Sequence, residues 1–145
     1  MPIALGGDHS IVLAELRAAA QVHGPLALVL FDSHPDTWDR YFGHPYFHGT
    51  PFRRAVEEDL LDTNRSTMMG LRGALYERAD WEQARALGFE LIPASELHRN
   101  GSPGVPERVP AQRSDPAGLP IIQHGDTLVK RIDPSEGRQK EHCHG

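Results

Sequence analysis

The sequence has little cysteine and no long apolar run. Its one cysteine, Cys143, excludes an intrachain disulfide and a zinc site built from several cysteines. A single cysteine also fits a reducing compartment. No apolar stretch reaches the roughly 18 residues that a membrane span needs, and the segment from Met1 to Gly7 lacks the basic region of a signal peptide. These absences predict a cytoplasmic protein.

Positive charge is also scarce. The chain has 15 Lys and Arg against 20 Asp and Glu, which gives a formal net charge of −5 and a pI near 6.0. This balance argues against a nucleic-acid partner, because nucleic acids are held by basic surfaces. Hydrophobic residues make up 39% and charged residues 24% of the sequence, which is typical of soluble globular proteins. A length of 145 residues corresponds to one domain or a piece of one.

Aromatic residues and lysines are unevenly distributed along the chain. All ten aromatic residues lie in residues 1–100, which contain no lysine. Residues 101–145 contain both lysines, six Gly and six Pro, a composition typical of irregular segments. We therefore expect a folded part over residues 1–98 and an irregular, disordered tail over residues 99–145.

The folded part alternates predicted strands and helices. An apolar run at 26–31 is typical of a central strand covered on both faces. Capping and turn residues bound the predicted helices, with Gly24-Pro25 and Gly88 after two of them and Thr50-Pro51 before another. The predicted order is strand 3–5, helix 11–20, strand 26–31, loop 32–49, helix 50–61, strand 67–71, helix 77–87 and strand 89–92. This order predicts an α/β fold with a mostly parallel sheet.

Two polar clusters follow predicted strands. Gly7-Asp8-His9-Ser10 follows the first strand, and Asp32-Ser33-His34-Pro35-Asp36 follows the apolar run. Because ligands gather at the carboxyl ends of parallel strands, we expect His9, Asp32, His34 and Asp36 to converge. An extended segment would turn the last three toward one side. Carboxylate and imidazole ligands suit manganese, iron, cobalt or zinc, and a carboxylate can bridge two ions. The alternative is that these aspartates only cap a helix or complete a turn.

Three ordered segments resemble the ureohydrolase family, which includes arginase, agmatinase, guanidinobutyrase and formiminoglutamase. They are Gly6-Gly7-Asp8-His9-Ser10, Phe31-Asp32-Ser33-His34-Pro35-Asp36 and His48-Gly49-Thr50-Pro51-Phe52-Arg53-Arg54-Ala55. The stretches 37–43 and 55–58 are most similar to the agmatinase and guanidinobutyrase branch. The resemblance runs from about residue 3 to about residue 98.

The resemblance implies a three-layer α/β/α fold, incomplete at both ends, and a site for two manganese ions. His9 and Asp36 resemble ligands of one ion, His34 resembles a ligand of the other, and Asp32 resembles the bridging carboxylate. His48 matches the histidine credited with proton transfer near the substrate. The implied reaction is hydrolysis of a small, agmatine-like guanidino compound to urea and an amine, with a homo-oligomer expected for the family.

Two departures from the family pattern bear on activity. Ser33 stands where the family most often has alanine, and the SFDxD segment that completes the family's metal site is absent. We expect Asp126 and Asp133 not to replace it, since neither follows a long apolar strand. A truncated or frame-shifted reading frame is one explanation. Three hypotheses remain: a ureohydrolase with impaired activity, an inactive metal-binding fragment, and an interaction partner of a full-length homologue.

Overall fold

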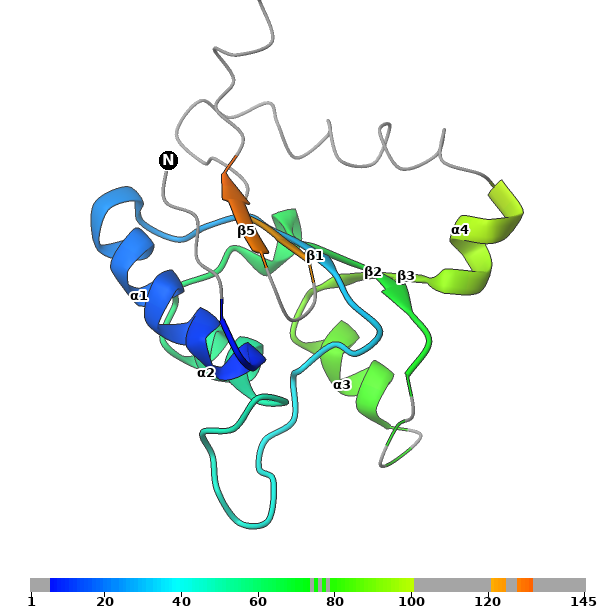
Figure 1. Ribbon diagram of the computed structural model, residues 1–145, viewed down its shortest axis with the longest axis horizontal. Helices are drawn as coiled ribbons and strands as arrows, with labels where there is room; N and C mark the ends of the chain where they lie inside the picture. The colour runs from blue at the N-terminus through cyan, green and yellow to red at the C-terminus, as the bar shows by residue number, and fades with distance from the viewer. Residues whose placement is uncertain are drawn as a thin grey trace, which may run out of the picture.

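A computed structural model of the chain describes residues 6–73, 75, 77 and 79–100, and the backbone of residues 121–124 and 128–131. Helices and strands alternate along the first hundred residues, as predicted. The elements are the short 3-10 helices η1 (His9–Ile11) and η2 (Thr63–Arg65), the helices α1 (Val12–His23), α2 (Pro51–Glu57), α3 (Asp80–Ala86) and α4 (Ala94–Asn100), and the strands β1 (Leu28–Phe31), β2 (Thr67–Leu71), β3 (Glu90–Pro93), β4 (Ile121–His124) and β5 (Leu128–Arg131) (Figure 1).

The strands form one mostly parallel sheet in the order β3-β2-β1-β4-β5. β1 lies between β2 and β4 and is parallel to both, with Phe31 paired to Met69 and to His124. β3 extends the parallel part, and only β5 runs antiparallel to its neighbour. The central position of β1 agrees with its apolar sequence, because such a strand is covered on both faces.

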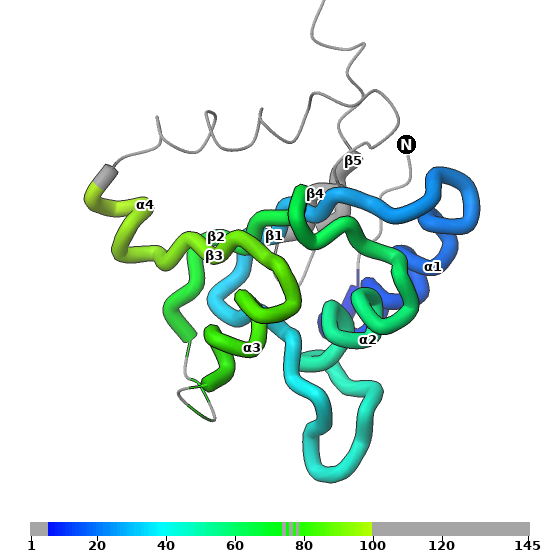
Figure 2. The backbone as a smooth tube through the Cα atoms, turned by 180° about the vertical axis from the view of Figure 1, so that it is seen from behind, coloured from blue at the N-terminus to red at the C-terminus, as the bar shows by residue number. Residues whose placement is uncertain are grey.

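Helices cover both faces of this sheet. Side chains alternate between faces along a strand. Leu28 and Leu30 of β1 therefore pack with α1, α2 and α3, whereas Val29 packs with Phe31 and with Leu97 of α4 on the opposite face. The two views of the chain agree that α1, α2 and α3 lie together, apart from α4 (Figures 1 and 2). The predicted three-layer α/β/α arrangement is confirmed.

Two glycines end helices where the sequence predicts it. Gly24 follows α1 with φ 72°, and Gly88 follows α3 with φ 100°. Both lie in the left-handed region, which glycine adopts without the steric penalty of a Cβ atom. These ends set where β1 and β3 begin.

The predicted helix over residues 50–61 is too long. α2 ends at Glu57, Asp59 turns the chain with φ 55°, and Leu61 makes a bridge beside Leu26 at the sheet. Leu61 is buried there. The free energy gained by burying this side chain outweighs what a further turn of α2 would contribute. Thr50 precedes the helix as predicted but caps it with no side-chain hydrogen bond, because its hydroxyl bonds the backbone of Phe47 instead.

Other differences lie at the two ends. α4 and the strands β4 and β5 are not predicted from the sequence; the strands lie within the segment expected to be irregular. Ile121 and Ile122 belong to β4 and pair with Leu28 and Val29 of β1. The predicted strand 3–5 lies outside the described residues. Among the residues that the structure describes, no helix is long and apolar enough to cross a membrane.

Candidate metal centre

The candidate site lies at the carboxyl end of β1. Asp32 follows this strand directly, and its backbone amide continues the ladder by donating to the carbonyl of Met69. Gly70 bulges beside it with φ 88°, and a Cβ at Gly70 would lie 3.3 Å from the carbonyl oxygen of Asp32. The close approach of β2 therefore fixes the backbone from which Asp32 projects.

His9 and Asp36 meet across 27 positions of sequence. His9 lies in η1, directly before α1, and its Nδ1 is 2.6 Å from Asp36 Oδ2. The same Nδ1 is 3.6 Å from Asp32 Oδ2. One ligand atom from each of these three side chains lies within 4.8 Å of the other two. This spacing suits a single divalent ion held by one nitrogen and two oxygens.

The protein places Asp36 in an unfavourable position for a carboxylate. Its side chain is buried, and burial raises the pKa of Asp36 above its ordinary value, against the lowering effect of the hydrogen bond with His9. Its backbone has φ 48°, a conformation that aspartate tolerates better than most residues. Strained backbone conformations and desolvated charged groups are both common at functional sites. A cation bound beside Asp36 would offset the cost of burying its charge.

Asp32 presents its two oxygens to two different histidines. Oδ2 faces His9, whereas Oδ1 is 3.9 Å from His34 Nδ1 and accepts a hydrogen bond from the His34 backbone amide at 3.0 Å. A carboxylate oriented in this way fits the bridging position implied by the family resemblance. Among the described residues, His34 is the side chain that lies nearest the other oxygen of Asp32 without belonging to the three-residue group.

The structure does not bring His34 into the three-residue cluster. The segment 32–36 is not extended, because the chain bends at Ser33 and His34. His34 Nδ1 instead contacts the hydroxyl of Ser33 at 2.9 Å, and the imidazole lies against Gly73. The condition under which all three side chains would turn to one side, an extended segment, is therefore not met. His34 remains 41% exposed at the edge of the site.

Phe52 supports the cluster from the core, a role that the sequence analysis did not assign. It is fully buried, and its ring meets the His9 imidazole edge-on, with centroids 5.3 Å apart and an interplanar angle of 80°. Its backbone amide donates to the carbonyl of Asp36 at 3.2 Å. The only signal in the sequence was the position of Phe52 inside the segment that begins at His48.

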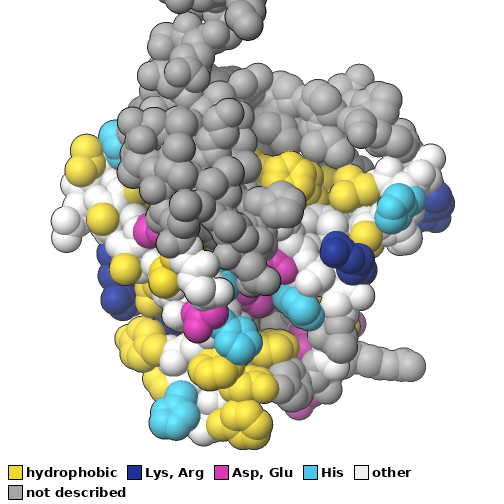
Figure 3. Space-filling view, viewed as in Figure 1, with side chains coloured by type: hydrophobic (Ala, Val, Ile, Leu, Met, Phe, Trp, Pro, Cys, Tyr) yellow, Lys and Arg dark blue, Asp and Glu magenta, His cyan; other side chains and the backbone are white. Residues whose placement is uncertain are grey.

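His48 lies on the loop between β1 and α2, which projects away from the sheet (Figure 2). It is exposed and packs against Phe47, with ring centroids 4.1 Å apart. The pKa of Asp8 is lowered, mainly by hydrogen bonds from Ser10 and in smaller part by the nearby His48 and His9 imidazoles. His48 therefore lies on the same side of the molecule as His9. The space-filling view shows histidine and acidic side chains gathered on this face beside a hydrophobic patch (Figure 3).

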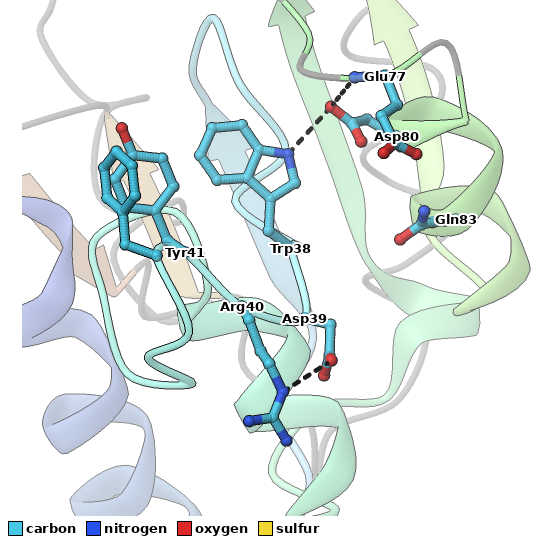
Figure 4. A pocket seen from close by; sticks show the side chains of 8 residues that line it. Trp38, Asp39, Arg40, Tyr41, Glu77, Asp80 and Gln83 are labelled. Atoms are coloured by element: carbon cyan, nitrogen blue, oxygen red, sulfur yellow. Dashed lines mark hydrogen bonds and ion pairs between the residues drawn. The ribbon is translucent and has the colours of Figure 1, made fainter.

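A pocket of about 390 Å³ lies between this loop and the start of α3. Trp38 crosses it and donates from Nε1 to Asp80 Oδ2 at 3.1 Å, while Tyr41 stacks on the indole with centroids 5.6 Å apart (Figure 4). The centroid of the same Tyr41 ring is 6.1 Å from that of His48, so Tyr41 lines the pocket and also contacts the histidine expected to transfer a proton. The pocket is lined by Trp38, Asp39, Arg40, Tyr41, Phe42, Glu77, Asp80 and Gln83.

Charge in the pocket is predominantly negative. Three carboxylates line it, and one of them, Asp39, is paired with Arg40 at 3.4 Å. Arg40 is the one guanidinium among the described lining residues and does not pair with Glu77 or Asp80. Asp39 is held by the buried Arg54, whose Nη2 lies 2.9 Å from its Oδ1, and this hydrogen bond lowers the pKa of Asp39. Aromatic faces and carboxylates together favour a cationic ligand over an anionic one.

Comparison with known proteins gives consistent matches. Residues 1–119 match the model of the arginase family. A guanidinobutyrase of Pseudomonas aeruginosa is 41% identical over 136 residues, which is 93% of this chain and 41% of that protein. A mitochondrial agmatinase of Gallus gallus is 46% identical over 96 residues, covering 66% of this chain and 28% of that protein. The solved structure of proclavaminate amidino hydrolase from Streptomyces clavuligerus superposes with a TM-score of 0.71 at 35% identity, covering 82% of this chain and 38% of that one.

The extent of these matches differs from the expectation. A match over 93% of 145 residues cannot fit within residues 3–98, so the similarity extends into the segment 99–145. The chain spans about two fifths or less of the length of each of these relatives.

Proposed function

This chain belongs to the arginase family, and we propose on that basis that it is part of a manganese-dependent ureohydrolase acting on an amine-ended guanidino compound. The observation that carries the proposal is the convergence of His9, Asp32 and Asp36 at the carboxyl end of β1. The proposal includes the cytoplasmic location predicted from the sequence and the homo-oligomer implied by the family resemblance. The chain covers 41% of the related guanidinobutyrase.

The side chains present fit a site for divalent cations. His9, Asp32 and Asp36 would hold one ion, and Asp32 with His34 would contribute to the second. Oxygen and imidazole ligands in this combination are compatible with manganese. Two bound ions would lower the pKa of a water molecule, so that hydroxide is present at neutral pH to attack the guanidinium carbon. The burial of the Asp36 carboxylate supports a cation here as well, because a bound cation would offset the cost of burying its charge.

His48 is the proposed proton donor to the leaving amine. An imidazole changes its charge near neutral pH, so it can both gain and release a proton under working conditions. His48 is exposed, lies on the face that carries His9, and packs against Phe47 and Tyr41. These contacts orient the ring while leaving it accessible to a substrate.

The pocket beside the loop supports an amine tail on the substrate. The carboxylates of Glu77 and Asp80 and the aromatic walls would attract an ammonium group and disfavour a carboxylate. An amine-ended compound such as agmatine is therefore expected to be a better substrate than the carboxylate-ended guanidinobutyrate. Equal or reversed rates of urea release from the two compounds would contradict this assignment of the tail.

Asp36→Asn tests the metal centre itself. A ligand that binds only the folded state stabilises it by about 2.7 kcal/mol at a concentration one hundredfold above its Kd. We expect Mn²⁺ to raise the melting temperature of the 145-residue chain and to permit urea release from agmatine. Asp36→Asn should abolish both effects, because an amide is a poor ligand and removes the charge of the buried carboxylate.

Asp59→Asn is the matched control. Asp59 also has a left-handed backbone, with φ 55°, but it is exposed and lies outside the cluster. It should keep the full response to Mn²⁺. A loss of the Mn²⁺ response in both variants, or in neither, would contradict the proposed centre.

A second candidate function is metal binding without turnover. It is favoured by the position of His34, which lies outside the group of three ligands within 4.8 Å. One tightly bound Mn²⁺ ion without urea release would identify this alternative. Urea release that is lost in Asp36→Asn would exclude it.

A further inference from the structure

Trp38 connects the long loop between β1 and α2 to the start of α3. Its indole Nε1 donates to Asp80 Oδ2 at 3.1 Å, and Asp80 is a buried carboxylate in the first turn of α3 (Figure 4). The same Oδ2 accepts a hydrogen bond from the backbone amide of Glu77 at 3.3 Å, so the acceptor is itself held in place. The indole therefore has a defined orientation relative to α3, although it belongs to a loop.

Trp38 also contacts the residue that follows His48. Its backbone amide donates to the carbonyl of Gly49 at 3.1 Å, and this hydrogen bond joins the beginning of the loop to its end. The indole lies over Gly49 so closely that a Cβ atom there would collide with the ring. Only glycine leaves room for this packing, and the backbone next to His48 is held against Trp38.

A continuous set of rings leads from Trp38 to the His48 imidazole. Tyr41 stacks on the indole, with centroids 5.6 Å apart and an interplanar angle of 9°. Tyr41 also stacks with Phe47, with centroids 4.4 Å apart and an angle of 17°. The His48 ring lies beside both, at centroid distances of 4.1 Å from Phe47 and 6.1 Å from Tyr41. The exposed imidazole thus packs on rings that are supported by Trp38.

We propose that Trp38 is a positioning residue that fixes His48 for protonation of the leaving amine. The inference rests on the proposed function, in which His48 supplies that proton. Trp38 acts on His48 in two ways, because it holds the backbone at Gly49 and supports the rings on which the imidazole packs. A general acid must lie within hydrogen-bond reach of the group that it protonates. A misplacement of about 1 Å can lower the rate about a hundredfold.

Trp38→Phe tests the proposal while keeping an aromatic ring at this position. The variant loses the hydrogen bond to Asp80 and part of the stacked surface. We expect kcat for urea release from agmatine in the presence of Mn²⁺ to fall about tenfold. In a His48→Ala background the same substitution should lower kcat no further, because a residue that acts through His48 then has nothing left to position.

Trp81→Phe is the matched control. Trp81 follows Asp80 directly in α3, and its Nε1 has no hydrogen-bond partner in the part of the chain that the structure describes. The same substitution there removes no hydrogen bond and should leave kcat unchanged. Equal losses of kcat in the two variants would overturn the proposal, as would additive losses from Trp38→Phe and His48→Ala. A rise of KM alone in Trp38→Phe would also overturn it, because Trp38 would then only line the pocket.

A second readout needs neither metal nor turnover. The rings beside His48 displace the chemical shifts of its imidazole protons, and the His48 signal is identified by its absence in His48→Ala. In Trp38→Phe this signal should move toward the position of an exposed histidine, whereas the signal of His23, at the end of α1, should stay in place. Asp80→Asn keeps an acceptor for the indole and should leave the His48 signal near its wild-type position.

The two readouts separate this proposal from the proposed function. An unchanged His48 signal in Trp38→Phe would overturn the positioning role. If the wild-type chain releases no urea, the proposed function fails, and the imidazole signal by itself decides whether Trp38 holds His48.

Discussion

Replacing Phe52 with alanine tests how the core supports the metal centre. Phe52, in α2, is 0% exposed and belongs to the core cluster that includes residues of α1 and the sheet. Truncating a buried phenylalanine costs about 3–5 kcal/mol, and the edge-on contact with His9 adds about 0.5–1.5 kcal/mol to what is lost. Because the free energy of unfolding of a domain is only about 5–15 kcal/mol, Phe52→Ala should remove a large share of it.

Urea denaturation measures this loss as a lower midpoint at an unchanged slope. Phe42→Ala is the matched control, since Phe42 is 85% exposed and its removal should change stability by less than about 0.5 kcal/mol. Comparable losses in the two variants would refute the reasoning. A loss below about 1 kcal/mol for Phe52→Ala would do the same.

Phe52→Leu separates the core from the metal centre. Leucine fills much of the same space, so the stability loss should stay below about 1.5 kcal/mol. The aromatic edge that faces His9 is removed, however, and we expect weaker binding of the first Mn²⁺ in a protein that still unfolds cooperatively. Unchanged Mn²⁺ affinity would mean that the ring contact does not orient His9.

Two further variants probe contacts outside the centre. Glu58 accepts hydrogen bonds from Arg17 at 2.7 and 2.6 Å, and this contact lowers its pKa from the ordinary 4.5; the pair therefore stabilises the fold above pH 4.5, and the gain is lost as pH falls through the folded pKa. Glu58→Gln should make the melting temperature less dependent on pH in that range. The change should correspond to less than about 1 kcal/mol in the free energy of unfolding, because the pair is partly exposed. Asp80→Ala removes the acceptor of Trp38 Nε1 and should cost about 1–3 kcal/mol. It should also speed tryptic cleavage after Arg40, and unchanged digestion would show that this contact does not hold the loop.

Much of the framework is predictable from the sequence because it depends on local properties. The apolar run before Asp32 forms the central strand, and Gly24 and Gly88 end helices through their positive φ angles. The order of strands and helices then places residues that follow β1 at one edge of the sheet. Local sequence was sufficient to select His9, Asp32 and Asp36 as candidates.

Side-chain direction within the site depends on contacts between distant segments. Asp36 meets His9, which lies 27 positions earlier, whereas His34 contacts Ser33 and lies against Gly73. Neither outcome follows from the spacing of the three ligand candidates in the segment 32–36. Whether that segment stays extended depends on the space that its neighbours leave.

Sequence by itself determined which residues can bind a metal ion and where along the chain they follow a strand. Only the tertiary structure decided which of them share one position, that Phe52 supports His9, and that β4 lies next to β1. The physical reason is that ligand types and strand ends are set by residues near in sequence. The distances between ligand atoms are set by packing and hydrogen bonds between segments far apart along the chain.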